Sequence, residues 1–186
     1  MRKTSLYIIA SMVLAMLVVG CGNKQQQGEG ADSTAVAVSV LDSALYGVVG
    51  EATSMHSLEL IDENGKKTTL ALDVDMKSDV QGGIMSGDHV TLVWTKNASG
   101  DMEAQKVVNI TTLLGKWSSL DRNFEIKDDG SVESQQVAET KPYTAWEMVN
   151  AKLVLSRDTF DVNYLGADSL LLENEKGIFA YKRIKK

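Results

Sequence analysis

The residue with the most distinctive chemistry in this 186-residue chain is its single cysteine, Cys21. An isolated cysteine can be a buried core residue, a reactive nucleophile or a point of covalent attachment. Arg2 and Lys3 open the chain, and an apolar run, residues 6–20, ends in Gly20 directly before the cysteine. A secretory signal typically has a positively charged beginning, then an apolar run, then a small residue before the site where the signal is cleaved. A membrane-spanning helix needs roughly 20 apolar residues, and this run is shorter. A secretory signal is therefore favoured over a membrane span.

The residues around the cysteine favour covalent attachment. Val18-Val19-Gly20-Cys21 resembles the lipobox of bacterial lipoproteins, with Leu17 and Val18 at the apolar positions and Gly20 at the small one. The resemblance implies that the signal is cut before Cys21, that a diacylglycerol is attached to its sulfur and that the new amino terminus is acylated. Two or more acyl chains give stable anchoring, whereas one gives marginal binding. Cys21 is therefore predicted to be a membrane tether.

No other residue pattern indicates catalysis or metal binding. His56 and His89 fall in separate predicted strands, and neither has another histidine or a cysteine at a metal-ligand spacing. The acidic residues gather at turns, as in "DDG" and "ENEKG", where they are ordinary solvated residues. The sequence also lacks the G-x-S-x-G elbow, the P-loop and the G-x-G-x-x-G fingerprint. We predict no catalytic residue, no metal site and no cofactor.

The charge balance argues against nucleic acid as a partner. The chain has 19 basic and 25 acidic residues, a net charge of −6. Removal of residues 1–20 takes Arg2 and Lys3 away, which leaves 17 basic residues against 25 acidic ones and a net charge of −8. Such a chain has no basic footprint for nucleic acid, and anionic lipid surfaces mildly repel it. With Cys21 acylated, the fold has no disulfide and depends on its apolar core.

The residues after the cysteine predict a linker. Residues 22–39 are rich in Gly, Gln, Ser and Ala and contain no aromatic residue, so they bury too little apolar area to fold alone. We predict a signal peptide at residues 1–20 and a lipidated cysteine with a flexible linker at residues 21–43. The alternating residues 35–41 could instead form a strand. About eighteen flexible residues reach roughly 20–25 Å, enough to clear the lipid headgroups.

The rest of the chain is predicted to be all-β, because its apolar residues recur with period two between turn residues. In a first domain, residues 44–111, Asn64-Gly65 is a strong hairpin signal, and residues 78–88 predict an irregular or briefly helical connection. Five strands in about 67 residues suit a small closed barrel that resembles the OB-fold, or an SH3-like barrel. We expect these strands at residues 45–53, 56–62, 67–74, 89–95 and 103–110.

A second domain, residues 112–186, contains about eight short segments of the same kind joined by tight turns. Such an up-and-down meander closes into a barrel and removes its own edges. The sequence therefore predicts two small antiparallel β-barrels. The segments of the second domain are residues 113–120, a hairpin over 123–137, 143–149, 152–158, 159–165, 169–175 and 177–184.

Two short motifs of the second domain carry a further resemblance. Gly115-Lys116-Trp117 near the first strand and Tyr181-Lys182-Arg183 on the last resemble the lipocalin family, in particular the short lipocalin-like domains at the C-terminus of Gram-negative lipoproteins. The resemblance implies that Gly115 and Trp117 belong to the motif closing one barrel end, with Arg183 packed over the ring. This cation–π contact is worth about 0.5–2 kcal/mol. The domain is half the length of a standard lipocalin, and a short eight-stranded barrel is usually filled by its own side chains.

The aromatic residues of the second domain have two interpretations. Phe160, Val162 and Tyr164 share one strand face by alternation, as do Phe179 and Tyr181, which favours packing in the core. The alternative is a partly apolar cleft in which tyrosine hydroxyls orient a small molecule. The candidate ligand-binding residues are then Tyr143, Trp146, Phe160, Tyr164 and Tyr181.

These features predict a lipid-anchored protein of the outer membrane. The residues after Cys21, "GNKQQQ", lack the acidic cluster linked to surface export in some lipoproteins, which favours the periplasmic face. The first functional hypothesis is a binding protein whose barrel, or the groove between its barrels, holds a small apolar or sugar-like ligand or a peptide. The second is a structural or interaction lipoprotein whose solid barrels dock another envelope component. An enzyme is least favoured, because no catalytic constellation is visible.

Overall fold

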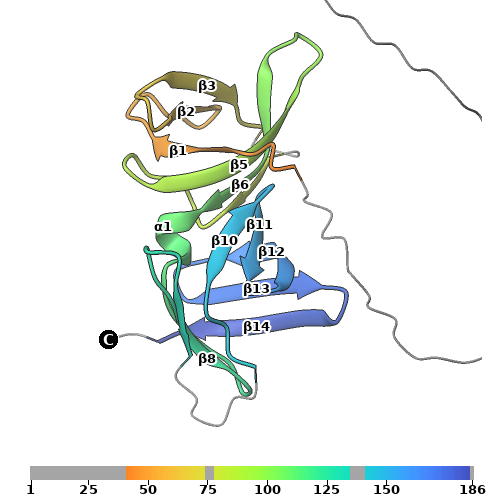
Figure 1. The fold of residues 1–186 in the computed structure, drawn as a ribbon. Coiled ribbons are helices and arrows are strands. Elements are labelled where there is room, and N and C mark those ends of the chain that lie inside the picture. Colours follow the sequence, from red (N-terminus) through yellow and green to blue (C-terminus); the bar gives the residue numbers. More distant parts are fainter. Residues whose placement is uncertain (1–40, 74–77, 135–140, 185–186) are drawn as a thin grey trace, which may run out of the picture. The chain divides into compact units, whose positions relative to one another are not determined.

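Residues 41–73, 78–134 and 141–184 are described by the computed structural model, and most of them form β-strands (Figure 1). The all-β prediction is confirmed. Both sheets belong to one compact unit, residues 40–186. The predicted signal peptide, Cys21 and the predicted linker up to residue 40 lie outside the described residues.

The first sheet contains six strands and forms the first barrel. Its strands follow the order β3-β2-β1-β5-β6, and a parallel contact between Ala71 of β3 and Glu103 of β6 closes the ring. A five-stranded ring with one parallel contact has the order of the OB-fold rather than that of an SH3-like barrel. The strands are β1 (Leu45–Val49), β2 (Ser57–Ile61), β3 (Lys67–Ala71), β4 (Asp79–Gln81), β5 (His89–Lys96) and β6 (Met102–Asn109).

The additional strand of this barrel, β4, lies where the sequence predicts an irregular connection. It runs parallel to β6, with Val80 opposite Val107. Val80 is its only apolar residue, so no period-two pattern marks it. Gly82 and Gly83, with φ of 92° and 69°, follow it in a conformation that favours glycine. The prediction of five strands was therefore one strand short.

One helical turn joins the two sheets in the described part of the chain. This turn, α1, covers Ile110–Leu113, and the Asn109 side chain caps it by accepting a hydrogen bond from the Thr112 backbone N–H at 2.9 Å. Among the residues described, no helix is long and apolar enough to cross a membrane.

The second sheet is the predicted eight-stranded meander and forms the second barrel. Its first strand, β7, lies beside its last, β14, with Trp117 opposite Arg183. The ring is nearly closed, because a single bridge between Ser131 and Ala145 joins β9 to β10. The strands are β7 (Gly115–Ser118), β8 (Asn123–Ile126), β9 (Val132–Ser134), β10 (Trp146–Val149), β11 (Lys152–Leu155), β12 (Asp158–Leu165), β13 (Ser169–Asn174) and β14 (Gly177–Arg183).

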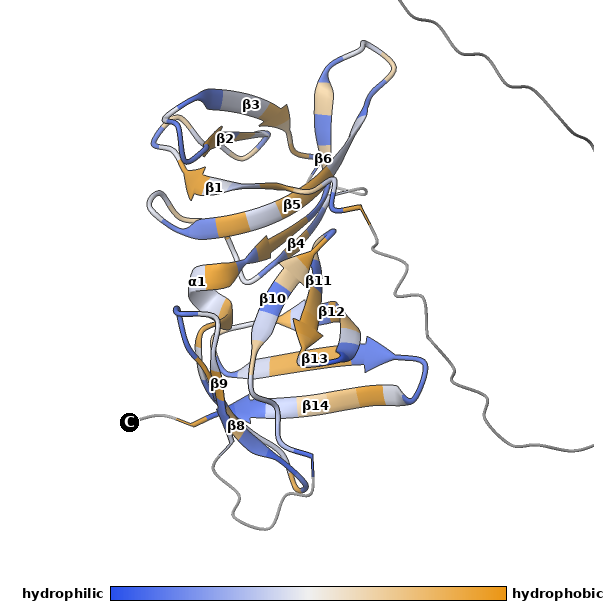
Figure 2. Cartoon of the chain, in the orientation of Figure 1, coloured by the Kyte–Doolittle hydropathy of each residue, from blue (hydrophilic) through white to orange (hydrophobic). Residues whose placement is uncertain are grey.

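Each barrel has a core of its own, and β6 contributes to both. Val107 packs in the first core and its neighbour Val108 in the second, as alternation along a strand requires. On β13, Figure 2 shows apolar residues in the middle of the strand and polar ones at the arrowhead. Leu170 and Leu172 are fully buried there. The outward face of β6 thus connects the two cores.

Candidate functional site

Trp117 and Arg183 meet at one end of the second barrel. The Trp117 side chain is fully buried, and its Nε1 donates a hydrogen bond to the Leu113 carbonyl oxygen at 2.8 Å. The guanidinium carbon of Arg183 lies 4.1 Å from the centre of the Trp117 ring. The buried ring and the guanidinium over its face, both expected from the sequence, are therefore present.

Backbone carbonyls hold the Arg183 guanidinium in place. Its Nε donates to the Ala167 carbonyl at 2.7 Å, its Nη1 donates to the Leu114 carbonyl at 2.8 Å, and its Nη2 donates to the Thr112 carbonyl. Burial lowers the pKa of Arg183 below its usual value, and arginine nevertheless stays charged. Arg183 thus ties the end of β14 to the segment around α1.

Gly115 is required by the same contact. Its φ is +121°, which side chains rarely adopt, and a Cβ at this position would lie 2.7 Å from Arg183 Nη1. Glycine therefore lets the guanidinium approach the backbone beside the Trp117 ring.

Three of the five candidate ligand residues lie in the core of the second barrel. Tyr143, Phe160 and Tyr181 are between 1% and 6% exposed. Their rings make edge-to-face contacts, with centroids 5.1 Å apart for Phe124 and Tyr181 and 6.4 Å apart for Tyr143 and Phe160. These rings occupy the interior where a lipocalin would hold a ligand.

The other two candidates are not buried in this core, although Trp146 packs against it. Trp146 is half-buried, and its Nε1 donates to the Lys127 carbonyl oxygen at 2.5 Å. The Tyr164 side chain is 50% exposed. A β-bulge between Val162 and Tyr164 shifts the register of β12 against β13, and Leu165 is buried instead. The prediction that Phe160, Val162 and Tyr164 share one face was therefore wrong for Tyr164.

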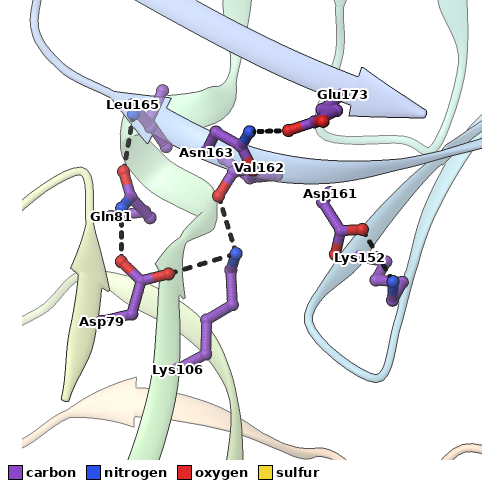
Figure 3. A network of polar contacts seen from close by, with 9 residues as sticks. All are labelled: Asp79, Gln81, Lys106, Lys152, Asp161, Val162, Asn163, Leu165 and Glu173. Atoms are coloured by element: carbon purple, nitrogen blue, oxygen red, sulfur yellow. Dashed lines mark hydrogen bonds and ion pairs between the residues drawn. The ribbon is translucent and has the colours of Figure 1, made fainter. Parts of the chain in front are cut away.

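Polar side chains of the first barrel bind the β12 backbone at this bulge (Figure 3). Lys106 Nζ donates to the Val162 carbonyl oxygen at 2.7 Å and lies 3.2 Å from a carboxylate oxygen of Asp79. Gln81 Oε1 accepts a hydrogen bond from the Leu165 backbone N–H at 2.8 Å. The pairing of β12 with β11 ends at Phe160, and these side chains bind backbone groups of β12 beyond that point.

The start of the described chain also binds the second barrel. Asn150, in the turn between β10 and β11, donates through its backbone N–H to Asp42 Oδ1 at 3.0 Å and accepts a hydrogen bond from the Ser43 N–H at 2.8 Å. The Tyr46 hydroxyl lies 2.6 Å from the Met148 carbonyl oxygen and 2.5 Å from Asp42 Oδ2. Burial, and then the hydrogen bond to Asp42, raise the pKa of Tyr46 to about 12, so this hydroxyl stays protonated. The chain thus enters the fold between its two barrels.

Sequence reasoning missed Lys106, Gln81, Tyr46 and Asn150, because their partners are distant in sequence. The separation is 56 residues for Lys106 and Val162 and 102 residues for Tyr46 and Met148. The one usable signal was a lysine within the apolar segment "KVVNI", where a charged residue needs a partner if it is buried.

The grooves on the outside of the described fold include three with volumes of about 470 to 550 Å³. One, of about 470 Å³, is lined by charged residues that include the ion pairs Lys152–Asp161 and Lys176–Asp158. A second, of about 480 Å³, is more apolar and lies beside the 99% exposed Leu120. The third, of about 550 Å³, lies on the first barrel and is lined by Tyr46 among others.

The described residues contain no group of three or more His, Cys, Asp or Glu side chains placed to hold a metal ion. Comparisons with known proteins found no family, no curated protein and no solved structure that matches the chain.

Proposed function

We propose that this chain is a lipid-anchored binding protein of the cell envelope that holds a small ligand on the outside of its barrels. Acylated Cys21 is the tether to the outer membrane, on its periplasmic face. The resemblance of residues 18–21 to a lipobox supports the anchor. The proposed role is non-catalytic, needs no cofactor and does not involve nucleic acid.

The main support for binding on the outside is that side chains fill the interior of the second barrel. Phe124, Phe160 and Tyr181 lie in one core cluster with Trp117, and each is at most 2% exposed. Close-packed interiors leave few voids larger than a water molecule. A ligand would have to displace these side chains to enter, so the outer grooves are the better binding sites. Their volumes fall within the range of about 300–1,000 Å³ found for ligand sites.

The alternative is a non-catalytic interaction lipoprotein that docks another envelope component with its solid barrels. The apolar groove beside Leu120 favours this role, because its lining includes Leu171 and Ala180 on the outward face of the sheet. An exposed apolar area of this kind often marks a contact with another molecule.

Native mass spectrometry of the lipidated chain, extracted from its own envelope in a mild detergent, separates these two roles. For the binding protein we expect a non-covalent adduct with the mass of a small molecule, lost at moderate collision energy. Recovery of the acylated chain without any adduct, or only with another polypeptide, would favour the docking role instead.

A further inference from the structure

The groove on the first barrel opens where two strands separate. β1 pairs with β5 at each residue from Leu45 to Val48, but its pairing with β2 is confined to Val48 and Val49. Leu45, Tyr46 and Gly47 therefore face a gap on the β2 side. At the head of this gap a Cβ on Gly47 would lie 2.4 Å from the Ile61 carbonyl oxygen, so glycine is needed where the strands converge.

Both sides of the groove are held in place before any ligand binds. The Tyr46 hydroxyl is fixed by the Met148 carbonyl and by Asp42, and the side chain remains 40% exposed. On the other side, Asp62 Oδ1 accepts hydrogen bonds from the backbone N–H groups of Asn64 and Lys66, each at 2.9 Å, which fixes the β2–β3 turn. A preorganised site loses less entropy when it binds.

Polar side chains without partners line the same groove. Within the described part of the chain, the side chains of Glu63, Asn64 and His89 make no hydrogen bond or ion pair. An amide both donates and accepts, a carboxylate accepts, and a neutral imidazole does one with each nitrogen. Val48 and Ile61 provide an apolar part of the lining.

The charge of the lining selects the class of ligand. Asp62 and Glu63 are among the lining residues, and no lysine or arginine is among them. Anionic ligands such as fatty acids, nucleotides and phosphates would be repelled. Hydroxyl groups, in contrast, donate strong hydrogen bonds to carboxylates. The negative face of a tyrosine ring attracts the weakly positive C–H groups that cover one side of a pyranose ring.

We propose that this groove binds an uncharged oligosaccharide, with a pyranose ring stacked on Tyr46 and its hydroxyls bonded to Glu63, Asn64 and His89. The inference rests on the proposed function, because it names the ligand class of a protein proposed to bind its ligand on the outside.

The test uses the lipidated full chain in a polyoxyethylene detergent, because sugar-based detergents would compete. The chain is applied to an array of neutral, amino and acidic oligosaccharides, and the strongest ligand is titrated by calorimetry. We expect a neutral oligosaccharide to bind and Tyr46→Ala to weaken its binding about tenfold or more, which is the loss of one stacked ring and its contacts. Tyr46→Phe keeps the ring and should weaken binding by less than about threefold.

Two further variants keep the test independent of folding. Glu63→Gln lies on an exposed turn and should weaken binding without a change in the circular dichroism spectrum. Lys176→Ala, in the charged groove, is the matched control and should bind normally. Absence of binding to every neutral oligosaccharide, or binding that neither Tyr46→Ala nor Glu63→Gln weakens, would overturn the inference. A small-molecule adduct that persists on Tyr46→Ala in native mass spectrometry would overturn it while the proposed function stands.

Discussion

Replacement of Trp117 by alanine is expected to lower the free energy of unfolding by about 3–5 kcal/mol, the usual cost of removing a large buried aromatic side chain. The ring is fully buried, and the substitution also removes the hydrogen bond from Nε1 to the Leu113 carbonyl. Natural domains are stable by only about 5–15 kcal/mol, so the variant will be close to unfolding at 37 °C. Urea unfolding followed by circular dichroism measures the loss.

The partnership of Trp117 with Arg183 is tested by the double variant. Arg183→Ala should cost less, about 1–3 kcal/mol, because the ring stays packed and the hydrogen bonds to three carbonyls are lost. Arg183→Lys is the control, since it keeps the charge but lacks the planar fork. We expect a coupling energy of about 0.5–2 kcal/mol between the two positions. If the two losses simply add, the guanidinium does not stabilise the ring.

Replacement of Cys21 by serine is expected to move the protein from the membrane fraction to the soluble periplasmic fraction. The serine variant is made behind a conventional cleavable secretion signal in place of residues 1–20, so that an uncut apolar segment does not hold it. Serine cannot carry the thioether-linked diacylglycerol, and without acyl chains the affinity for the bilayer is lost. Immunoblots of separated fractions give the result, and circular dichroism shows whether the barrels remain folded.

The control for this experiment is the unsubstituted chain with its own residues 1–20, which should stay in the membrane fraction. Protease added to intact cells then identifies the face of the membrane. Protection of the anchored chain is expected for the periplasmic face, and rapid loss would mean surface display. Retention of the serine variant in the membrane would contradict the lipid anchor.

Much of the fold could be predicted because its physical cause is local. Alternating residues such as Leu58, Leu60 and Leu70 fill a one-sided core, so period two marks their strands without any knowledge of the partners. β4 escaped prediction because its strand character comes from its pairing with β6 and not from its own residues. The bulge in β12 escaped for a similar reason, since the sequence "DVNYL" alternates and does not mark an extra residue.

The contacts of side chains were predictable only where a motif related two distant positions. The resemblance to lipocalins linked Trp117 to Arg183 across 66 residues, and the two do make contact. No such motif linked Lys106 to Val162 or Asn150 to Asp42, because a backbone carbonyl can be bound by almost any donor that the fold brings near. The groove on the first barrel depends on where β1 and β2 separate, which alternation does not show.

A crystal structure under xenon pressure shows whether the second barrel is filled, which would leave only its outside for ligands. Xenon enters empty apolar cavities, including those made by core truncation. We expect no xenon among Phe124, Phe160 and Tyr181 in the natural chain, and a xenon atom in the control Leu153→Ala, which removes a fully buried side chain from the same core. Xenon bound inside the unsubstituted barrel would contradict a filled interior and would make that interior a possible ligand site.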